Sequence, residues 1–204
     1  MGQRSQIYIR YNGGKTLVAY HLQWNYGKSM INRAYQLLEF INKSKETRDM
    51  YSSGENLYYS DKAKEALKTL IQLNLTTGEF QFGHDLILEE FKYFNKENKD
   101  YFKINPKQQD NNNGILIIDI QDNGKIKYGF AVGYEGETKD DAFNIISARK
   151  YGVAYQDCAN EKDMFVAEQQ VKFIDNNFEL LTQADYNEIF NQEYYYKDCL
   201  EKKE

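Results

Sequence analysis

The start of the chain alternates apolar and polar positions with a period of two, which is the pattern of half-buried strands. It predicts one strand at Gln6–Tyr11 and a second at Thr16–Trp24. The residues between them, Asn12-Gly13-Gly14, tolerate a positive φ and favour a tight hairpin. We therefore expect an antiparallel hairpin whose second strand turns these side chains to one face: Val18, Tyr20, Leu22 and Trp24.

The period then changes to that of helices. Apolar residues recur at helical spacing over Met30–Asn42, whereas residues 44–59 are polar and are predicted to form a loop. Two further helices are expected, one after Ser60 and one after Asp85, with a very short strand between them at Phe80–Phe82. The helix after Asp85 is predicted to turn these residues inward: Ile87, Leu88, Phe91 and Phe94.

The most polar stretch lies between Asn95 and Gly114 and contains the only proline, Pro106. Its composition does not support a core, so we expect a long loop or the joint between two halves of the chain. The predicted division is an N-terminal lobe at 1–97, a polar loop or linker at 98–113 and a C-terminal lobe at 114–204, together forming one compact unit.

The strongest strand signal is Ile115–Gln121, whose nearly continuous apolar residues suit a central strand covered on both faces. A turn at Asp122-Asn123-Gly124 leads to another strand at Ile126–Tyr134. A variant of the capping box at Thr138–Asp141 then predicts a helix that ends at Gly152. Its inward-facing residues are expected to be Ala142, Phe143, Ile145 and Ile146.

Strand, turn, strand and capped helix thus occur twice, which raises the hypothesis of two related strand–strand–helix units. The fold class we expect is α+β, with antiparallel β-hairpins and helices packed on one side. Residues 164–174 fit either a helix or strand pieces, and we interpret them as strand. A second capping-box variant at Thr182–Asp185 predicts a last helix carrying Tyr186, Ile189 and Phe190.

The charge balance is mildly acidic, with 26 Lys and Arg against 31 Asp and Glu. Hydrophobic residues make up 41% of the chain, which is typical of a soluble globular protein. The lysines are interleaved with acids, so no basic footprint for sequence-specific DNA binding is expected. A net charge of -5 also falls short of the sustained acidity of a DNA mimic.

The cysteines and the N-terminus bear on the cellular compartment in which the protein is expected. Cys158 and Cys199 have no metal-ligand spacing and suggest reduced thiols. The opening residues contain no apolar signal-peptide core, and no apolar run approaches the length of a membrane span. We expect a protein of the bacterial cytoplasm that does not bind a membrane.

Catalytic and cofactor signatures are not found in the sequence. It contains no phosphate-binding loop, nucleophile elbow, zinc-protease motif or dinucleotide fingerprint. His21 and His84 occur in unlike contexts, so we expect no metal and no cofactor. Asp119 interrupts the strongest strand and is a candidate site residue, although an outward-pointing carboxylate is the plainer interpretation.

The best constellation of chemical groups is predicted at the open end of the first hairpin. Antiparallel pairing places the residues before the first strand beside those after the second. One guanidinium, one hydroxyl, two amides and two aromatic rings would then share a small surface that suits recognition better than acid–base catalysis. The candidate binding residues are Arg4, Ser5, Gln23, Trp24, Asn25 and Tyr26. The alternative is a structural corner in which Trp24 fills the core.

The sequence around these residues also resembles that of other proteins. The opening Met1-Gly2-x-Arg4-Ser5, a hairpin and then Gln23-Trp24-Asn25-Tyr26-Gly27 before a helix resemble a set of uncharacterised bacterial and phage proteins. Their pattern begins Met-Gly-Thr-Arg-Ser and has an aromatic, Asp, Gly, Tyr-Pro break after the hairpin. The resemblance covers about the first forty residues and departs from the pattern at Gln3 and at Asn25, where the pattern has Asp. It implies a phage or mobile-element context and no reaction.

Two functions are therefore predicted as alternatives. The first is a non-enzymatic interaction protein that binds a host protein or nucleoprotein complex, for example an anti-CRISPR-like inhibitor of a defence system. Abundant Tyr suits such recognition surfaces, and the chain has 18. The second is a protein that binds or hydrolyses a small nucleotide-like ligand at the Arg4/Trp24/Tyr26 corner.

Overall fold

Two hairpins lie side by side at the centre of the fold. In the first, β1 (Arg4–Tyr11) and β2 (Thr16–Gln23) pair antiparallel. In the second, β5 (Ile115–Ile120) and β6 (Ile126–Val132) do the same. β1 and β5 run parallel as neighbours, with Ile7 opposite Leu116. The N-terminal and C-terminal parts of the chain therefore contribute to one sheet.

The computed structural model describes residues 4–23, 25–51, 83–94, 99–106, 114–133, 143–154 and 161–200. The sheet within these ranges has seven strands in the order β3-β2-β1-β5-β6-β7, and β8 pairs with β6. The added strands are β3 (Gly83–Asp85), β7 (Asn144–Ile146) and β8 (Glu179–Leu180). Helices and a mixed sheet together confirm the α+β class.

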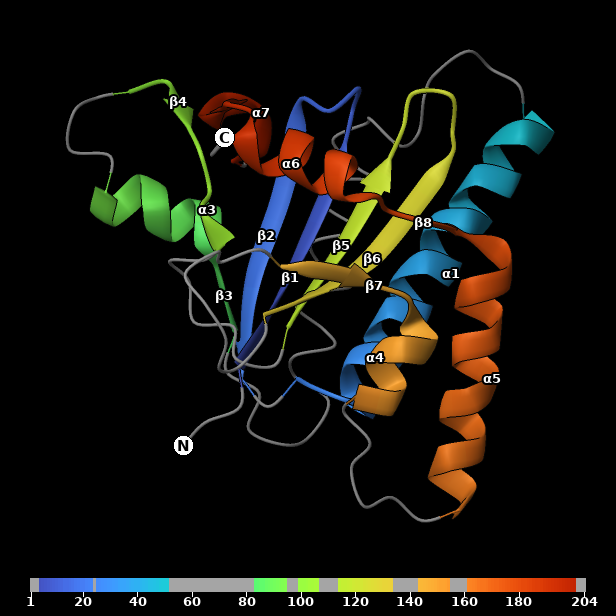
Figure 1. The fold of residues 1–204 in the computed structure, drawn as a ribbon. Coiled ribbons are helices and arrows are strands. Elements are labelled where there is room, and N and C mark those ends of the chain that lie inside the picture. Colours follow the sequence, from blue (N-terminus) through green and yellow to red (C-terminus); the bar gives the residue numbers. More distant parts are fainter. Residues whose placement is uncertain are drawn as a thin grey trace.

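One face of the sheet is covered by three helices, which Figure 1 shows on its right-hand side. They are α1 (Lys28–Tyr51), α4 (Ala148–Ala154) and α5 (Glu161–Asn177). Alternate strand residues such as Ile9, Tyr20 and Ile118 pack against them in the larger core cluster. Because β-strand side chains alternate between faces, this cluster takes every second residue of the four central strands.

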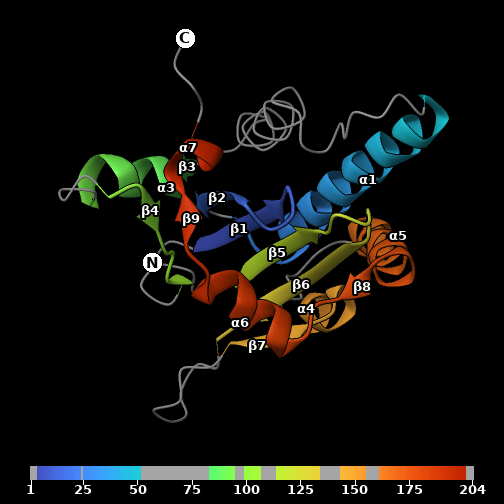
Figure 2. The same cartoon turned by 90° about the horizontal axis from the view of Figure 1, so that it is seen from above.

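The opposite face carries its own layer, so the expectation that helices cover only one side is wrong. Figure 2 shows this layer from above. Its elements are α3 (Leu86–Glu89), the π-helical turn η2 (Glu90–Phe94), β4 (Tyr101–Phe102), α6 (Gln183–Asn191), β9 (Tyr194–Tyr195) and α7 (Tyr196–Cys199). Tyr8, Ile115 and Ile117 lie in the second core cluster beneath these elements. Both faces of β5 are therefore buried, as its apolar sequence predicts.

The local signals that depend on turn and cap chemistry are confirmed. Asn12, Gly13 and Gly14 all have positive φ angles, as the tight turn requires. A side chain at Gly13 would also collide with Asp122 of the neighbouring hairpin turn, since its Cβ would lie 2.8 Å from Oδ2. Thr182 and Asp185 form the predicted capping box at the start of α6.

The first helix is longer than the sequence predicted. α1 continues to Tyr51, so the loop expected from residue 44 is wrong up to that position. The segment is polar, yet it contains no Gly or Pro and is rich in Lys, Glu and Arg, which have good helix propensity. Glu39 and Lys43 form an i,i+4 ion pair just before it. Polarity in this segment therefore does not mark a loop.

Two predictions in the C-terminal half are wrong. Residues 144–146 form β7, and the helix α4 begins only at Ala148 with Gly152 inside it. The β-branched pair Ile145 and Ile146 adds to the edge of β6 instead of starting a helix. The segment read as strand pieces, 164–174, is helical and lies within α5.

The sequence of residues 164–174 in α5 fits both the helical pattern and the strand pattern. Val171 and Ile174 are three positions apart and both contact the core, which is the helical alternative of the ambiguous pattern. Residues that lie on one face of a helix can pack together against α1, and this packing settles the choice.

The helix expected after Asp85 has a different buried face. Asp85 does cap it, because Oδ1 accepts hydrogen bonds from the backbone N–H groups of Ile87 and Leu88. Leu86 and Ile87 are buried, whereas Leu88 and Phe91 are exposed. After a single α-helical turn the chain widens into η2, so the regular spacing used for the prediction does not apply.

Part of the predicted loop or linker also has structure. Within residues 98–113, β4 pairs antiparallel with β9, and Phe102 and Ile104 are buried in the second core cluster. The sequence places these apolar residues at alternate positions inside a polar stretch. That alternation, rather than the overall composition, corresponds to the observed structure.

The hypothesis of two related strand–strand–helix units does not agree with the arrangement. A two-fold axis along the strands is the rotation that would superpose β1–β2 on β5–β6, and it would place the following helices on opposite faces. Instead α1 and α4 pack on the same face, and β7 separates α4 from its hairpin.

Several predictions lie outside the described residues: the helix after Ser60, the strand at Phe80–Phe82 and the capping box at Thr138–Asp141. In the part of the chain that the structure covers, none of the helices is long and apolar enough to cross a bilayer.

Candidate functional site

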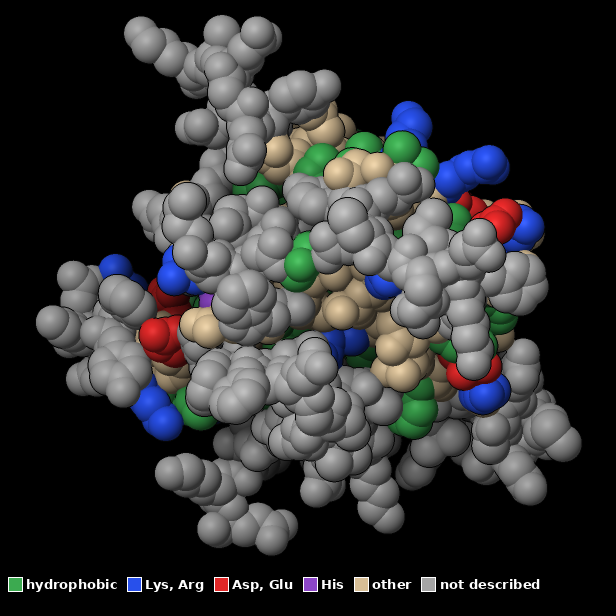
Figure 3. Space-filling view, turned by 90° about the horizontal axis from the view of Figure 1, so that it is seen from below, with side chains coloured by type: hydrophobic (Ala, Val, Ile, Leu, Met, Phe, Trp, Pro, Cys, Tyr) green, Lys and Arg blue, Asp and Glu red, His purple; other side chains and the backbone are tan. Residues whose placement is uncertain are grey.

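The open end of the first hairpin brings its predicted residues together. Arg4 lies opposite Gln23, and Ser5 lies opposite Leu22. We call the group formed by Arg4, Ser5, Gln23, Asn25, Tyr26 and Arg33 the sheet-end corner. Trp24 lies outside the described residues. Figure 3 shows this end of the molecule, where the described acidic and basic side chains are scattered rather than gathered.

The centre of the corner is a buried polar network. Asn25 is fully buried, and its amide nitrogen donates to Ser5 Oγ at 3.2 Å and contacts Met30 Sδ at 3.2 Å. Its amide oxygen accepts a hydrogen bond from Arg33 Nε at 2.6 Å. These bonds fasten the end of β2 to the first turns of α1. Ser5 and Asn25 are thus engaged within the fold, while Arg4, Gln23 and Tyr26 are partly exposed.

Arg33 is a member of the corner that the sequence prediction missed. Its side chain is buried with 6% of the residue exposed, and burial lowers the pKa of its guanidinium to about 10. It still carries its charge at neutral pH. The sequence does indicate that Arg33 is buried, because it lies three positions after Met30 and four before Leu37, on the apolar side of the predicted helix.

Asp119 is buried and does not point outward. Its carboxylate receives two hydrogen bonds from Arg10, from Nε at 2.8 Å and from Nη2 at 3.0 Å. Only 1% of Asp119 is exposed. Burial alone would lower the pKa of Arg10, but the hydrogen bonds and charge of Asp119 raise it above its ordinary value. The parallel register of β1 and β5 places the two residues directly opposite each other.

The Arg10–Asp119 pair continues into a network under α6. Arg10 Nη1 also donates to Glu188 Oε1 at 2.8 Å and to Gln192 Oε1 at 3.2 Å. Beside it, Lys127 Nζ donates to Asp185 Oδ1 at 2.9 Å. Glu188 and Asp185 on α6 each pair with a basic residue of the sheet, so the arrangement holds α6 in place.

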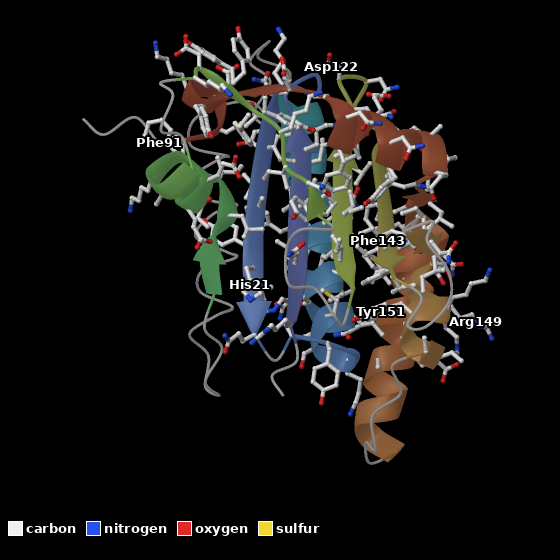
Figure 4. All side chains as sticks on the ribbon, turned by 60° about the vertical axis from the view of Figure 1, so that its left-hand side comes forward. His21, Phe91, Asp122, Phe143, Arg149 and Tyr151 are labelled. Carbon is white, nitrogen blue, oxygen red and sulfur yellow. The ribbon has the colours of Figure 1, made fainter. Side chains whose placement is uncertain are left out.

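The two histidines are closer than their sequence contexts suggested. His21 on β2 lies directly opposite His84 on β3 in the strand register. Figure 4 shows His21 near the lower end of β2. Among the described residues, however, no three His, Cys, Asp or Glu side chains gather in a way that would hold a metal ion.

Small residues on β6 have a packing role. The sequence places Gly129, Ala131 and Gly133 on one strand face, where small residues let another part of the molecule approach closely. A Cβ atom at Gly129 would lie 2.7 Å from Ile145 Cγ2 and 3.4 Å from Leu181 Cβ. Side chains from β7 and from the segment before α6 therefore occupy the space over Gly129.

Exposed aromatic rings gather instead at the edge of the second layer. We call α3, η2, β4, β9 and α7 the lateral module, which Figures 1 and 2 show beside β2. Tyr101 is 56% exposed and Phe91 is 43% exposed, which is unusual for rings of this size. Figure 4 shows Phe91 on the α3 side of the molecule. With Leu88 and the half-buried Tyr195, these residues form what we call the aromatic surface.

Each of the exposed rings packs against another ring, which is half-buried for Tyr101 and buried for Phe91. Tyr101 packs on Tyr195 with centroids 5.1 Å apart, and Phe91 meets the edge of Tyr196 at 5.0 Å. Beneath them, Phe102 stacks on Tyr196 at 4.5 Å. Burial, and then the Glu90 carboxylate, raise the pKa of Tyr196 to about 12, so that its hydroxyl stays neutral.

Hydrogen bonds fix the lateral module to the rest of the fold. Tyr194 Oη donates to the Ile189 carbonyl at 2.8 Å, and the Leu17 backbone N–H donates to Cys199 Sγ at 3.3 Å. Within the module, Tyr196 N donates to the Asp100 carbonyl at 2.9 Å, which joins the start of α7 to the segment before β4. The aromatic surface therefore belongs to a module that these hydrogen bonds hold in one position.

Sequence reasoning missed the aromatic surface for two reasons. Phe91 and Leu88 fitted a helical pattern and were assigned to the core, and Tyr101 lay in a stretch read as a linker. The Tyr194–Tyr196 run was the available signal, since three consecutive rings in a strand place at least one of them on the outer face.

Comparison with known proteins adds no assignment. No protein-family model matches the chain, and no significant match is found among curated proteins or solved structures.

Proposed function

We propose that this chain is an interaction protein of a phage or mobile element that binds a host macromolecule through its aromatic surface. The observation that supports this proposal is the exposure of Phe91 and Tyr101, each of which packs against another ring of the lateral module. Aromatic residues are enriched at the centres of protein interfaces, where they bury large areas at a small entropic cost. Large rings left in water, by contrast, bring a folded chain no stability.

The aromatic surface is also preorganised. Tyr101 and Tyr195 are held by cross-strand pairing and by contact with each other, so little side-chain freedom is lost when a partner covers them. The sheet-end corner offers less, because Ser5 and Asn25 are already hydrogen-bonded inside the fold. A nucleotide-like ligand at that corner would have to be recognised by Arg4, Gln23 and Tyr26, which are partly exposed.

A pull-down with matched variants tests the proposal. Tagged wild-type protein, a Phe91→Ala/Tyr101→Ala variant and a Val153→Ala control are incubated with a bacterial lysate. Val153 is 65% exposed on α4, so it is an equally accessible apolar residue outside the lateral module. We expect a stoichiometric partner with wild type and control and its loss with the double variant. Equal recovery with all three proteins, or no stoichiometric partner, would contradict the proposal.

Inhibition of a host defence system is a concrete form of this function. Expression of the wild-type chain would then raise the plating efficiency of a phage on a host that carries an active defence system. The Phe91→Ala/Tyr101→Ala variant should abolish that gain, and the Val153→Ala control should keep it.

A further inference from the structure

The charges around the Tyr101–Tyr195 pair suggest what kind of partner it receives. Lys99 and Lys103 lie two positions before and after Tyr101, and Lys197 lies two positions after Tyr195. All three lysines are exposed. Lys197 Nζ lies 5.6 Å from the centroid of the Tyr195 ring and hydrogen-bonds the Tyr195 hydroxyl, so one positive charge is held at the tyrosine pair. Glu193 is the one acid at the corresponding positions of these two segments, and Asp100 and Asp198 lie next to Tyr101 and Lys197 in the sequence.

We infer that the Tyr101–Tyr195 pair and its neighbouring lysines dock an acidic segment of a partner protein. This inference rests on the proposed function and specifies the chemistry of the partner. Acidic side chains of such a segment would meet Lys99, Lys103 and Lys197. An apolar or aromatic side chain of the same segment would cover the two tyrosine rings, which already pack together at 5.1 Å.

The arrangement favours an acidic protein segment over a nucleic acid. A nucleic acid would extend its phosphates beyond the tyrosine pair towards α3 and η2, where the carboxylates of Glu89 and Glu90 would repel them. The two rings also contact each other, whereas platforms for single strands offer separate rings to successive bases. A short acidic segment needs only the local positive charge, which the three lysines supply.

The tyrosine hydroxyls and the rigid base add directional contacts. The Tyr101 phenol offers a donor and an acceptor at the rim of an apolar patch, the combination by which tyrosine anchors protein interfaces, and the Tyr195 hydroxyl is hydrogen-bonded with Lys197. Phe102 and Tyr194 pair on the inner side of the same two strands and lie in the second core cluster. The outer rings therefore stay in place when the partner is absent.

A binding assay with defined polymers tests the inference. The probes are a fluorescent random copolymer of Glu and Tyr, a Glu homopolymer and an oligodeoxythymidine of matched length. Fluorescence anisotropy is measured with wild type, Tyr101→Ala, Lys197→Ala and a Lys150→Ala/Val153→Ala control on α4. We expect the copolymer to bind wild type and control more tightly than the other two probes. Each lateral-module variant should weaken it by about tenfold, as for a residue at an interface centre.

The results separate this inference from the proposed function. Tighter binding of the oligodeoxythymidine, lost in Tyr101→Ala, would overturn the acidic-protein partner while leaving the aromatic surface as the binding site. Absence of copolymer binding, or equal binding by all four proteins, would overturn the inference, and the pull-down would then decide the proposed function on its own. Circular dichroism of each variant checks that it is folded, which is expected because Tyr101 and Lys197 are exposed.

Discussion

The sheet-end corner and the lateral module use polar and aromatic residues in opposite ways. In the corner, Ser5, Asn25 and Arg33 are buried and bonded to one another. In the lateral module, Phe91 and Tyr101 stand in solvent although both are large rings. A buried polar group needs its partners for the fold to be stable, whereas an exposed ring contributes little to stability. We therefore expect substitutions in the first region to change stability and substitutions in the second to change binding.

The largest effect is expected where a buried charge loses its partner. Asp119→Asn removes the buried carboxylate that neutralises the Arg10 guanidinium and leaves the exposed Glu188 as its acidic partner. Breaking a buried ion pair in this way costs about 3–5 kcal/mol. Urea denaturation should show a loss of that size, and a loss below about 1 kcal/mol would mean that the pair behaves as a surface salt bridge.

A smaller effect is expected in the sheet-end corner. Asn25→Ala removes the acceptor of the Arg33 Nε–H bond and the donor to Ser5 Oγ. Leaving buried polar groups without a partner costs about 1–3 kcal/mol. The free energy of unfolding should fall within this range while copolymer binding stays at the wild-type level. Weakened binding in a folded Asn25→Ala protein would show that the corner takes part in recognition.

The cap of α6 predicts a pH dependence. Burial alone would raise the pKa of Asp185, but hydrogen bonds from Thr182 and Lys127 lower it below its ordinary value. A depressed folded-state pKa means that the stabilisation is complete above the unfolded-state pKa and is lost as the pH falls through the folded-state pKa. Asp185→Asn should therefore cost about 1 kcal/mol at neutral pH, the typical value of a cap.

The same variant supplies the control for this prediction. The stability difference between wild type and Asp185→Asn should shrink as the pH falls below the ordinary range of aspartate, because the wild-type carboxylate then becomes neutral too. Urea denaturation at neutral and acidic pH measures the difference. A difference that stays constant with pH would show that the cap stabilises α6 through geometry alone.

The smallest effect on stability is expected on the aromatic surface. Tyr101 is 56% exposed, so Tyr101→Ala should change the free energy of unfolding by about 0.5 kcal/mol or less. Phe102→Ala, one residue further along β4, removes a buried ring and should cost about 3–5 kcal/mol. Thermal unfolding of the two variants compares the outer and inner faces of the same strand. Similar losses would mean that Tyr101 belongs to the core.

The sequence predicted what depends on neighbours along the chain. The period of two, the Asn-Gly turns and the Thr182–Asp185 cap all specify local geometry, and all are confirmed. The sequence did not predict the parallel pairing of β1 with β5, which brings Arg10 and Asp119 together. Such a contact depends on residues far apart in the chain, and one isolated Asp in a strand has no local signature of its partner.

The candidate site was harder to predict than the fold. The proximity of Arg4 and Gln23 follows from hairpin pairing and is observed. The burial of Asn25 follows from the way α1 packs over β1 and β2, which the strand pattern alone does not specify. Exposure of Phe91 depends on the π-helical turn, and exposure of Tyr101 depends on its pairing with Tyr195 from the end of the chain.

The most direct test of the account is the binding of the Glu–Tyr copolymer to two variants with opposite predictions. Tyr101→Ala should bind about tenfold more weakly than wild type while unfolding at the same urea concentration. Asn25→Ala should bind as wild type does while unfolding at a lower urea concentration. Weak binding by Asn25→Ala together with normal binding by Tyr101→Ala would contradict the assignment of recognition to the lateral module.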